Sequence, residues 1–237
     1  MSSLHGASSH VLAAVTGGAG NPWFSWTYVR ENTHTLLSAF QQHVELTAIS
    51  VLIATVIAVP LGVLAHRVSW LTGPILALSS VLYTIPSLGL FAILAPFVGP
   101  YASTVVIGLV LYALLVIVRN TLTGLRQVPV GVRAAAEGMG YGRFGLLARI
   151  ELPLSLPSIM TGLRIATVST VAMVTVGSAV GGYGGFGELI LEGFRNNFYK
   201  AQIMTATIAT VLLALVLDLC LIGLARLVTP WTRRRSS

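Results

Sequence analysis

Long stretches without any charged side chain are the feature that most limits how this chain can fold. Asp, Glu, Lys and Arg are all absent from residues 68–118, 165–187 and 201–217. Apolar segments of about 18 or more residues can cross a membrane as helices, which satisfy their own backbone hydrogen bonds there. Charged residues make up 9% of the chain and hydrophobic residues 55%, whereas about a quarter of a soluble domain is charged. The sequence therefore predicts an all-α integral membrane protein.

About five transmembrane helices are expected, over residues 44–65, 71–98, 101–118, 158–180 and 201–224. The second of these contains Pro74, Pro86, Gly89 and Pro96. Because proline lacks an amide donor and clashes with the preceding turn, this helix is expected to be kinked or broken. Splitting it in two gives six spans.

The basic residues are divided unevenly between the two sides that five spans define. Arg30, Arg195 and Lys200 fall on one side. The other side collects eleven of the fourteen basic residues: Arg67, Arg119, Arg126, Arg133, Arg143, Arg149, Arg164, Arg226, Arg233, Arg234 and Arg235. The positive-inside rule makes this second side cytoplasmic, with the N-terminus outside and the C-terminus inside. The net charge of +7 follows from this distribution and does not indicate nucleic-acid binding, which needs a basic face on a soluble domain.

The parts of the chain outside the spans have distinct expected roles. Residues 1–43 form an extracytoplasmic segment, of which residues 22–42 are expected to lie at the outer interface because they are rich in Trp and Tyr. A loosely ordered tail is the alternative, and the apolar stretch 11–15 is too short to span. Residues 44–225 form the membrane domain, with a cytoplasmic loop at 119–157, and residues 226–237 form a basic cytoplasmic tail.

The cytoplasmic loop has the pattern of a folded element. Residues 132–139 are an Ala-rich helix candidate, and Gly140 is a suitable stop because glycine tolerates a left-handed cap. A second apolar segment, 144–152, contains Arg149, and Pro153 and Pro157 stiffen the return to the membrane. A short helix held below the membrane at both ends could dock a cytoplasmic partner. The alternative is an amphipathic loop that rests on lipid headgroups.

At this loop the chain resembles the binding-protein-dependent, type I permeases of ABC importers. That family has Glu-Ala-Ala, three residues, Gly, nine residues, Ile, one residue and Leu-Pro. The same spacing occurs at Ala134-Ala135-Ala136, Gly140, Ile150 and Leu152-Pro153. Ala134 replaces the family's Glu, and Glu137, three residues later on the same helical face, is the candidate substitute.

Other segments are similar to the osmoprotectant branch of that family, which transports glycine betaine, choline, proline betaine and related solutes. They are Val59-Pro60-Leu61-Gly62, Thr84-Ile85-Pro86-Ser87-Leu88, Arg119-Asn120-Thr121, Gly138-Met139-Gly140, Glu151-Leu152-Pro153-Leu154, Gly162-Leu163-Arg164 and the glycine-rich run from Gly181 to Glu188. The resemblance covers roughly residues 40–225.

The resemblance implies the ABC type I importer permease fold in a bacterial cell membrane. It also implies three partners: an ATP-binding subunit, a second permease (identical or paralogous) and an extracellular solute-binding protein. ATP would be hydrolysed by the ATP-binding subunit, so this chain is expected to be a transport subunit and not an enzyme. The implied coupling helix, which docks the ATP-binding subunit, consists of Arg133, Ala134, Ala135, Ala136, Glu137, Gly138, Met139 and Gly140.

Three alternatives remain open at this point. One is a permease of the same class for an amino acid such as methionine. Another is a proton- or sodium-driven transporter that works alone. The third is a membrane scaffold without transport activity.

No catalytic, cofactor-binding or metal-binding pattern occurs in the sequence, and the phosphate-binding GxxxxGK[ST] motif is missing. Asp218 is the one acid deep within a predicted span, either a coupling site or a structural acid close to Arg164. Tyr83, Pro86 and Ser87 are candidates for the translocation path, because a broken helix at membrane depth lines protein or a cavity. The spans contain no run of aromatic residues that could hold a quaternary ammonium group. Selectivity is therefore expected in the solute-binding protein.

Overall fold

The computed structural model describes residues 20–99, 102–181 and 183–231, and within these ranges the fold is built from helices. The predicted stretch 11–15 and the tail residues Arg233–Arg235 lie outside the described residues. The helices are α2 (Trp26–Glu31), α3 (Thr33–Arg67), α4 (Ser69–Thr84), α5 (Ser87–Val98), α6 (Ala102–Arg126), α7 (Val130–Gly138), α8 (Arg143–Leu146), the π-helix η1 (Leu147–Glu151), α9 (Leu152–Gly181), α10 (Gly185–Arg195) and α11 (Lys200–Val228).

The described residues contain the expected number of membrane-crossing segments. Four are long apolar helical segments: α3, α6, α11 and the continuous stretch Arg143–Ser178, which joins α8, η1 and most of α9. The fifth is the pair α4 and α5, which meet at an angle of 98°. The predicted all-α membrane fold and the broken second span are both confirmed.

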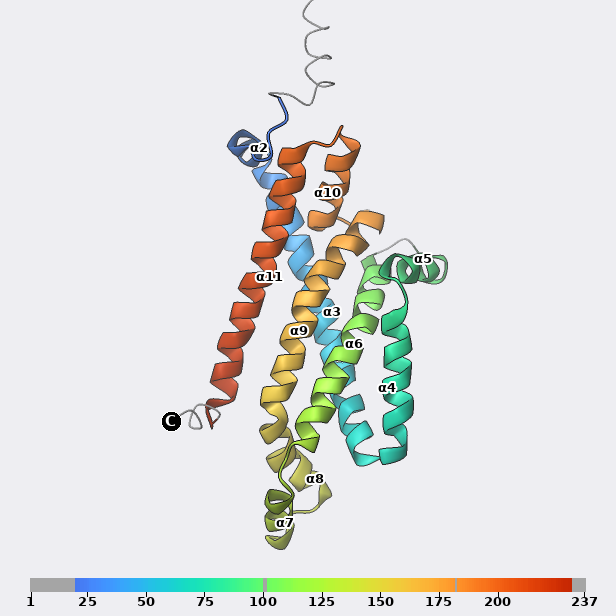
Figure 1. Cartoon of the computed structure of the whole chain (residues 1–237), viewed down its shortest axis with the longest axis vertical. Coiled ribbons are helices and arrows are strands. Elements are labelled where there is room, and N and C mark those ends of the chain that lie inside the picture. The colour runs from blue at the N-terminus through green and yellow to red at the C-terminus, as the bar shows by residue number, and fades with distance from the viewer. Residues whose placement is uncertain (1–19, 100–101, 182, 232–237) are drawn as a thin grey trace, which may run out of the picture.

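The bend between α4 and α5 follows from Pro86. The residue before a proline is pushed out of the helical region, and Ile85 is extended with φ −65° and ψ 128°. After the bend, α5 runs roughly perpendicular to α4 and lies beside the upper end of α6 instead of continuing along the bundle (Figure 1). Phe91 of α5 packs into a notch at Gly108 and Gly177, where an added Cβ would come within 2.6 Å and 3.1 Å of its ring.

The first span is longer than the sequence predicted. α3 runs without a break from Thr33, so residues 33–43, expected in the N-terminal segment, continue the spanning helix. The interfacial part that precedes it is reduced to the six-residue helix α2. Tyr28 of α2 stacks edge-to-face on Tyr199, with ring centroids 5.4 Å apart, and burial raises the pKa of Tyr28 to about 12.

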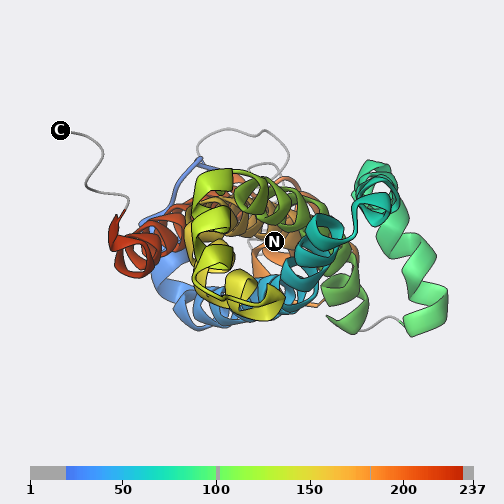
Figure 2. The same cartoon turned by 90° about the horizontal axis from the view of Figure 1, so that it is seen from below.

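The core lies between α3, α6 and α9, which Figure 2 shows bundled together with α4–α5 and α11 on opposite sides. Small residues let these helices approach closely. A Cβ on Gly62 of α3 would lie 2.7 Å from the side chain of Thr121 of α6. A Cβ on Gly162 of α9 would lie 2.5 Å from that of Asn120. The short helices cap the bundle, with α7 and α8 at one end and α2 and α10 at the other (Figure 1).

Candidate functional site

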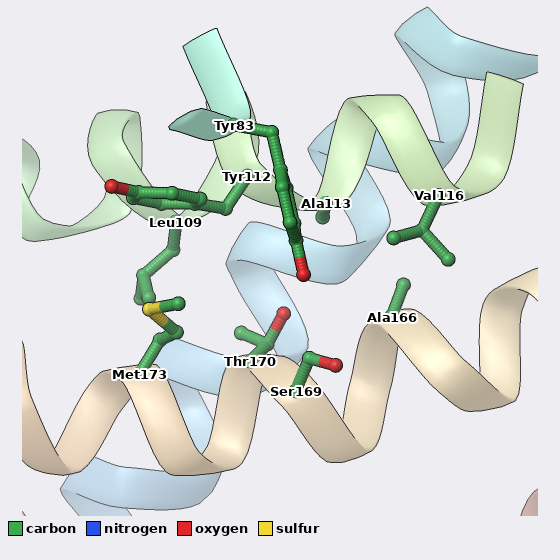
Figure 3. Close-up of a pocket in the computed structure, with 9 residues that line it drawn as sticks. All are labelled: Tyr83, Leu109, Tyr112, Ala113, Val116, Ala166, Ser169, Thr170 and Met173. Carbon is green, nitrogen blue, oxygen red and sulfur yellow. The ribbon is translucent and has the colours of Figure 1, made fainter. Parts of the chain in front are cut away.

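Tyr83, near the C-terminal end of α4, lines a small pocket between α4, α6 and α9 (Figure 3). The break after Thr84 leaves Tyr83 beside α6, where its ring meets that of Tyr112 edge-to-face at a centroid distance of 5.8 Å. Figure 3 shows the Tyr83 hydroxyl directed toward Ser169 and Thr170 of α9. Of the three path residues suggested by the sequence, Tyr83 therefore reaches the pocket, whereas Pro86 and Ser87 form the bend itself.

Tyr112 supports the broken helix. Its hydroxyl donates a hydrogen bond to the backbone carbonyl of Ile85, an extended residue that lies in the bend between α4 and α5. Irregular backbone at membrane depth needs such a partner from neighbouring protein. This aromatic pair could not be found from the sequence, because Tyr83 and Tyr112 are far apart along the chain and meet only in the folded bundle.

The pocket is too small for a solute. Its free space is about 10 Å³, which is near the minimum needed for one water molecule. The remaining walls come from α6 and α9: Leu109, Ala113, Val116, Ala166 and Met173. On the outer face of this wall, 42% of the Tyr83 surface is exposed.

Asp218, the acid within the last span, is paired with Arg164 of α9. The carboxylate accepts two parallel hydrogen bonds, from Arg164 Nε at 2.8 Å and from Nη2 at 2.9 Å. Bidentate pairing of this kind fixes geometry as well as charge. The pair lines an open groove of about 300 Å³ that also reaches Ser169, so the groove adjoins the Tyr83 pocket along α9.

The loop that was predicted to be cytoplasmic contains the expected helix, as α7. Gly140 follows it with φ +85°, a left-handed conformation that glycine adopts without strain. Three apolar side chains of the loop are uncovered, since Val130, Met139 and Phe144 are 78%, 70% and 81% exposed. Exposed apolar side chains that occur close together are candidates for contact with another protein.

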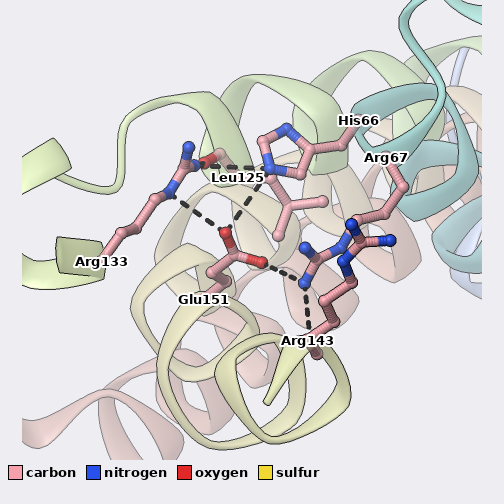
Figure 4. Close-up of polar contacts among 6 residues, drawn as sticks. All are labelled: His66, Arg67, Leu125, Arg133, Arg143 and Glu151. Carbon is pink, nitrogen blue, oxygen red and sulfur yellow. Dashed lines mark hydrogen bonds and ion pairs between the residues drawn. The ribbon is translucent and has the colours of Figure 1, made fainter. Parts of the chain in front are cut away.

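One buried carboxylate holds this loop to the bundle (Figure 4). Glu151, the last residue of η1, is 1% exposed. Its Oε1 atom lies 3.1 Å from Arg133 Nε and 3.7 Å from His66 Nε2, and its Oε2 atom lies 2.8 Å from Arg67 Nη2. A buried acid is stable only where opposite charge and hydrogen bonds compensate for lost water. Arg67 provides both, since its Nη2 donates a hydrogen bond to Oε2, and Arg133 adds a second positive charge.

The same basic side chains also bind backbone carbonyl groups. Arg133 donates to the carbonyl of Leu125 at the end of α6, and Arg67 donates to that of Arg143 at 3.0 Å. The cluster of His66, Arg67, Arg133 and Glu151 thus connects α3, α6, α7, α8 and η1. It is called here the cytoplasmic junction, after the side that the positive-inside rule predicts for it. Arg133 was predicted to lie on the docking helix, but its partner Glu151 was not predicted.

At the opposite end of the bundle, α3 is joined to the glycine-rich turn and α10. His43 is fully buried, accepts the Phe186 N–H at Nδ1 at 3.4 Å and lies 3.1 Å from the Val171 carbonyl through Nε2. Since Nδ1 is the acceptor, Nε2 carries the proton and donates. Gln42 accepts the Gly185 N–H at 2.9 Å, in a turn where Gly184 and Gly185 both have φ +79°.

Within the described ranges, no group of three or more His, Cys, Asp or Glu side chains is placed to hold a metal ion. Charged side chains within the described bundle serve instead to join helices.

Comparison with known proteins gives consistent matches over most of the chain. Residues 36–234 match the family described as "Binding-protein-dependent transport system inner membrane component". The glycine betaine/carnitine/choline transport system permease protein OpuCD of Bacillus subtilis is 35% identical over 211 residues, which are 89% of this chain and 92% of that protein. The osmoprotectant import permease protein OsmW of Salmonella typhimurium is 36% identical over 208 residues, 86% of this chain and 96% of that protein.

A solved structure of the MetNI methionine ABC transporter in an inward-facing conformation has the same fold. One of its chains matches with a TM-score of 0.77 at 21% identity, covering 84% of this chain and 98% of that one. At this identity the match concerns the arrangement of the helices and not the solute.

Proposed function

Because this chain belongs to the family of inner membrane components of binding-protein-dependent transport systems, we propose that it is the permease subunit of an ATP-driven importer for osmoprotectants. The relatives OpuCD and OsmW are named for glycine betaine, carnitine and choline, or for osmoprotectants in general. The three named solutes share a quaternary ammonium group. That group is the proposed recognition feature of the solute, and methionine, the solute of the structural relative, lacks it.

The observation that carries the proposal is the uncovered cytoplasmic helix α7. The helix is held to the bundle by Arg133, while Val130 at its start and Met139 just after its end are exposed. The proposed occupant of that surface is the ATP-binding subunit, which would press on the helix spanning Arg133 to Gly140. A helix that is anchored to the bundle and also carries exposed apolar side chains can pass a push from a second protein to the bundle.

The translocation path is proposed to lie between two permease copies, identical or paralogous. The pocket at Tyr83 holds too little space for a solute, whereas Tyr83, Ser169 and the Arg164–Asp218 pair lie along one exposed wall. The exposed ring of Tyr83 offers a π face to a quaternary ammonium cation. An extracellular solute-binding protein would deliver the solute to the end of the bundle that carries α10.

The orientation follows from the basic residues. The cytoplasmic junction, with Arg67 and Arg133, lies at the same end as α7 and α8, and the C-terminal end of α11 points the same way (Figure 1). The positive-inside rule assigns this end to the cytoplasm. The N-terminal helix α2 and the helix α10 would then face outward.

The test is to co-express the chain with a candidate ATP-binding subunit and a candidate solute-binding protein from the same genome. We expect co-purification, and uptake of radiolabelled choline or glycine betaine into proteoliposomes that needs both ATP and the binding protein. Val130→Asp should reduce recovery of the ATP-binding subunit, because a charge is placed in the proposed contact. Phe198→Asp, a matched change at an exposed ring (63%) on the other end, should leave that recovery unchanged.

Two results would overturn the proposal. Uptake by the permease alone, without ATP, would identify a secondary transporter. Uptake that excess methionine abolishes but excess choline and glycine betaine do not would identify a permease of the same class for an amino acid.

A further inference from the structure

The cytoplasmic junction lies between the helix that would receive force and the helices that would have to move. We infer that Glu151 is the positioning residue that transmits movement of α7 to the two membrane helices α3 and α9. The inference rests on the proposed function, since it assumes that α7 is moved by an ATP-binding subunit.

The two oxygen atoms of the Glu151 carboxylate face different helices. Oε1 is paired with Arg133 of α7 at 3.1 Å, and Oε2 is paired with Arg67 of α3 at 2.8 Å. Because both pairs share one rigid carboxylate, a displacement of Arg133 changes the position that Arg67 must adopt. Residues 67 and 133 are far apart in sequence, so this contact is a direct route between α7 and the end of the first span.

Glu151 is also joined covalently to α9. It is the residue immediately before Leu152, where α9 begins. The route from α7 to α9 along the backbone passes through the turn at Gly140, whose left-handed φ of +85° marks a non-helical joint. The Arg133–Glu151 ion pair connects α7 to the start of α9 directly. A displacement of α7 can therefore move α9 without being transmitted along the backbone of the turn at Gly140.

Burial makes the link stiff. The Glu151 side chain is 2% exposed, against 26% for Arg133 and 31% for Arg67. Coulomb attraction is several times stronger near or below a protein surface than in bulk water, and water has little access to the shared acid. A second contact from Arg133 to the Leu125 carbonyl fixes the Arg133 side chain from behind.

The position of Ala134 supports this role for Glu151. Ala134, where a glutamate would be expected from the resemblance, is exposed on α7, so an acid there would face away from the bundle. The carboxylate that organises the inner side of the loop in this chain is therefore Glu151, supplied from the far end of the loop.

The experiment uses the complete transporter, reconstituted in proteoliposomes with its ATP-binding subunit and solute-binding protein. ATP hydrolysis and uptake of radiolabelled choline or glycine betaine are measured together, giving solute molecules per ATP. Glu151→Gln keeps the size of the side chain and removes its charge, and Arg67→Gln removes the link to α3 alone. The matched control is Glu45→Gln, an exposed acid on α3 at the end away from the junction.

We expect Glu151→Gln to retain the ATP-binding subunit and to hydrolyse ATP, while solute per ATP falls by roughly tenfold, a usual size for coupling between two sites. Arg67→Gln should lower the same ratio by a smaller factor, and Glu151→Asp, which keeps the charge, should restore most of it. Glu45→Gln should match the wild type. Should Glu151→Gln fail to assemble, Arg67→Gln decides the question, since Arg67 is more exposed and its loss disturbs less packing.

The outcomes separate the inference from the proposed function. If the wild-type complex does not take up solute with ATP, the proposed function fails whatever the variants do. If the wild type works and both Gln variants have its ratio of solute to ATP, the inference is wrong. Lower thermal stability with an unchanged ratio would make Glu151 a purely structural residue and would equally overturn the inference.

Discussion

The two ends of the bundle join the same helices by different chemistry. At the end proposed to be cytoplasmic, α3 and the start of α9 are connected by ion pairs around the buried carboxylate of Glu151. At the end proposed to face outward, called here the outer end, the contacts are neutral hydrogen bonds: His43 donates to the Val171 carbonyl of α9 and accepts the Phe186 N–H of α10, and Gln42 accepts the Gly185 N–H. There the helices approach so closely that a Cβ on Gly187 would overlap the carbonyl oxygen of Thr175.

This difference shows which end is suited to transmit movement. An interlocked backbone contact has one arrangement, because tightly packed interiors do not deform continuously. The buried Glu151 carboxylate is paired with both arginines, so a shift of α7 that keeps these pairs must carry the ends of α3 and α9 with it. The outer end is therefore a fixed clamp, and the end that carries α7 is a linkage.

Removing the shared acid should have the largest effect on stability. In the isolated chain, Glu151→Gln leaves Arg67 and Arg133 without their compensating charge, and breaking a buried ion pair in this way costs about 3–5 kcal/mol. Thermal unfolding of the detergent-solubilised protein would measure the loss. Arg67→Gln should cost less, because its side chain is 31% exposed and the acid keeps Arg133. Equal unfolding temperatures for Glu151→Gln and wild type would contradict the role of the junction.

The second test concerns the clamp at the outer end. Gly187→Ala forces a methyl group against the backbone carbonyl of Thr175 and the side-chain hydroxyl of Ser178 on α9, and overpacking of this kind costs about 1–3 kcal/mol. The matched control is Gly223→Ala on α11, where nothing lies within 4 Å of the added Cβ. The same unfolding assay should show a loss for the first variant and none for the second, since alanine favours a helix over glycine. If the two variants unfold alike, α10 is not packed on α9 as described.

Much of the fold could be predicted from the sequence because the signals are local. Runs without charge mark the spans, Pro86 marks the bend through its effect on Ile85, and Gly140 marks the end of α7. The contacts that define the candidate sites are not local. Tyr83 contacts Tyr112, and Glu151 contacts Arg67, only after the helices have packed. No periodic pattern in the sequence predicts such contacts.

The motifs that resemble the family also mark positions where two helices touch. Gly62 packs on Thr121 and Gly162 on Asn120, so segments that suggested the family separately are in contact in the bundle. The sequence identified these residues by resemblance, and the structure gives the physical reason for them, which is close helix approach. Glu151 also belongs to a segment that resembles the family, Glu151-Leu152-Pro153-Leu154. The segment alone does not indicate which basic residues surround the acid in the folded protein.

The smallest expected effect distinguishes backbone packing from side-chain bonding within the outer clamp. Gln42→Ala removes the acceptor of the Gly185 N–H, and a hydrogen bond of this kind contributes about 1 kcal/mol. Gln41→Ala is the matched control, since Gln41 is the adjacent exposed residue on α3. We expect a small fall in unfolding temperature for Gln42→Ala relative to Gln41→Ala, well below that caused by Gly187→Ala. A loss at Gln42 as large as that at Gly187 would mean that the turn is held by this one side chain, and the outer end would then be a second linkage, not a fixed clamp.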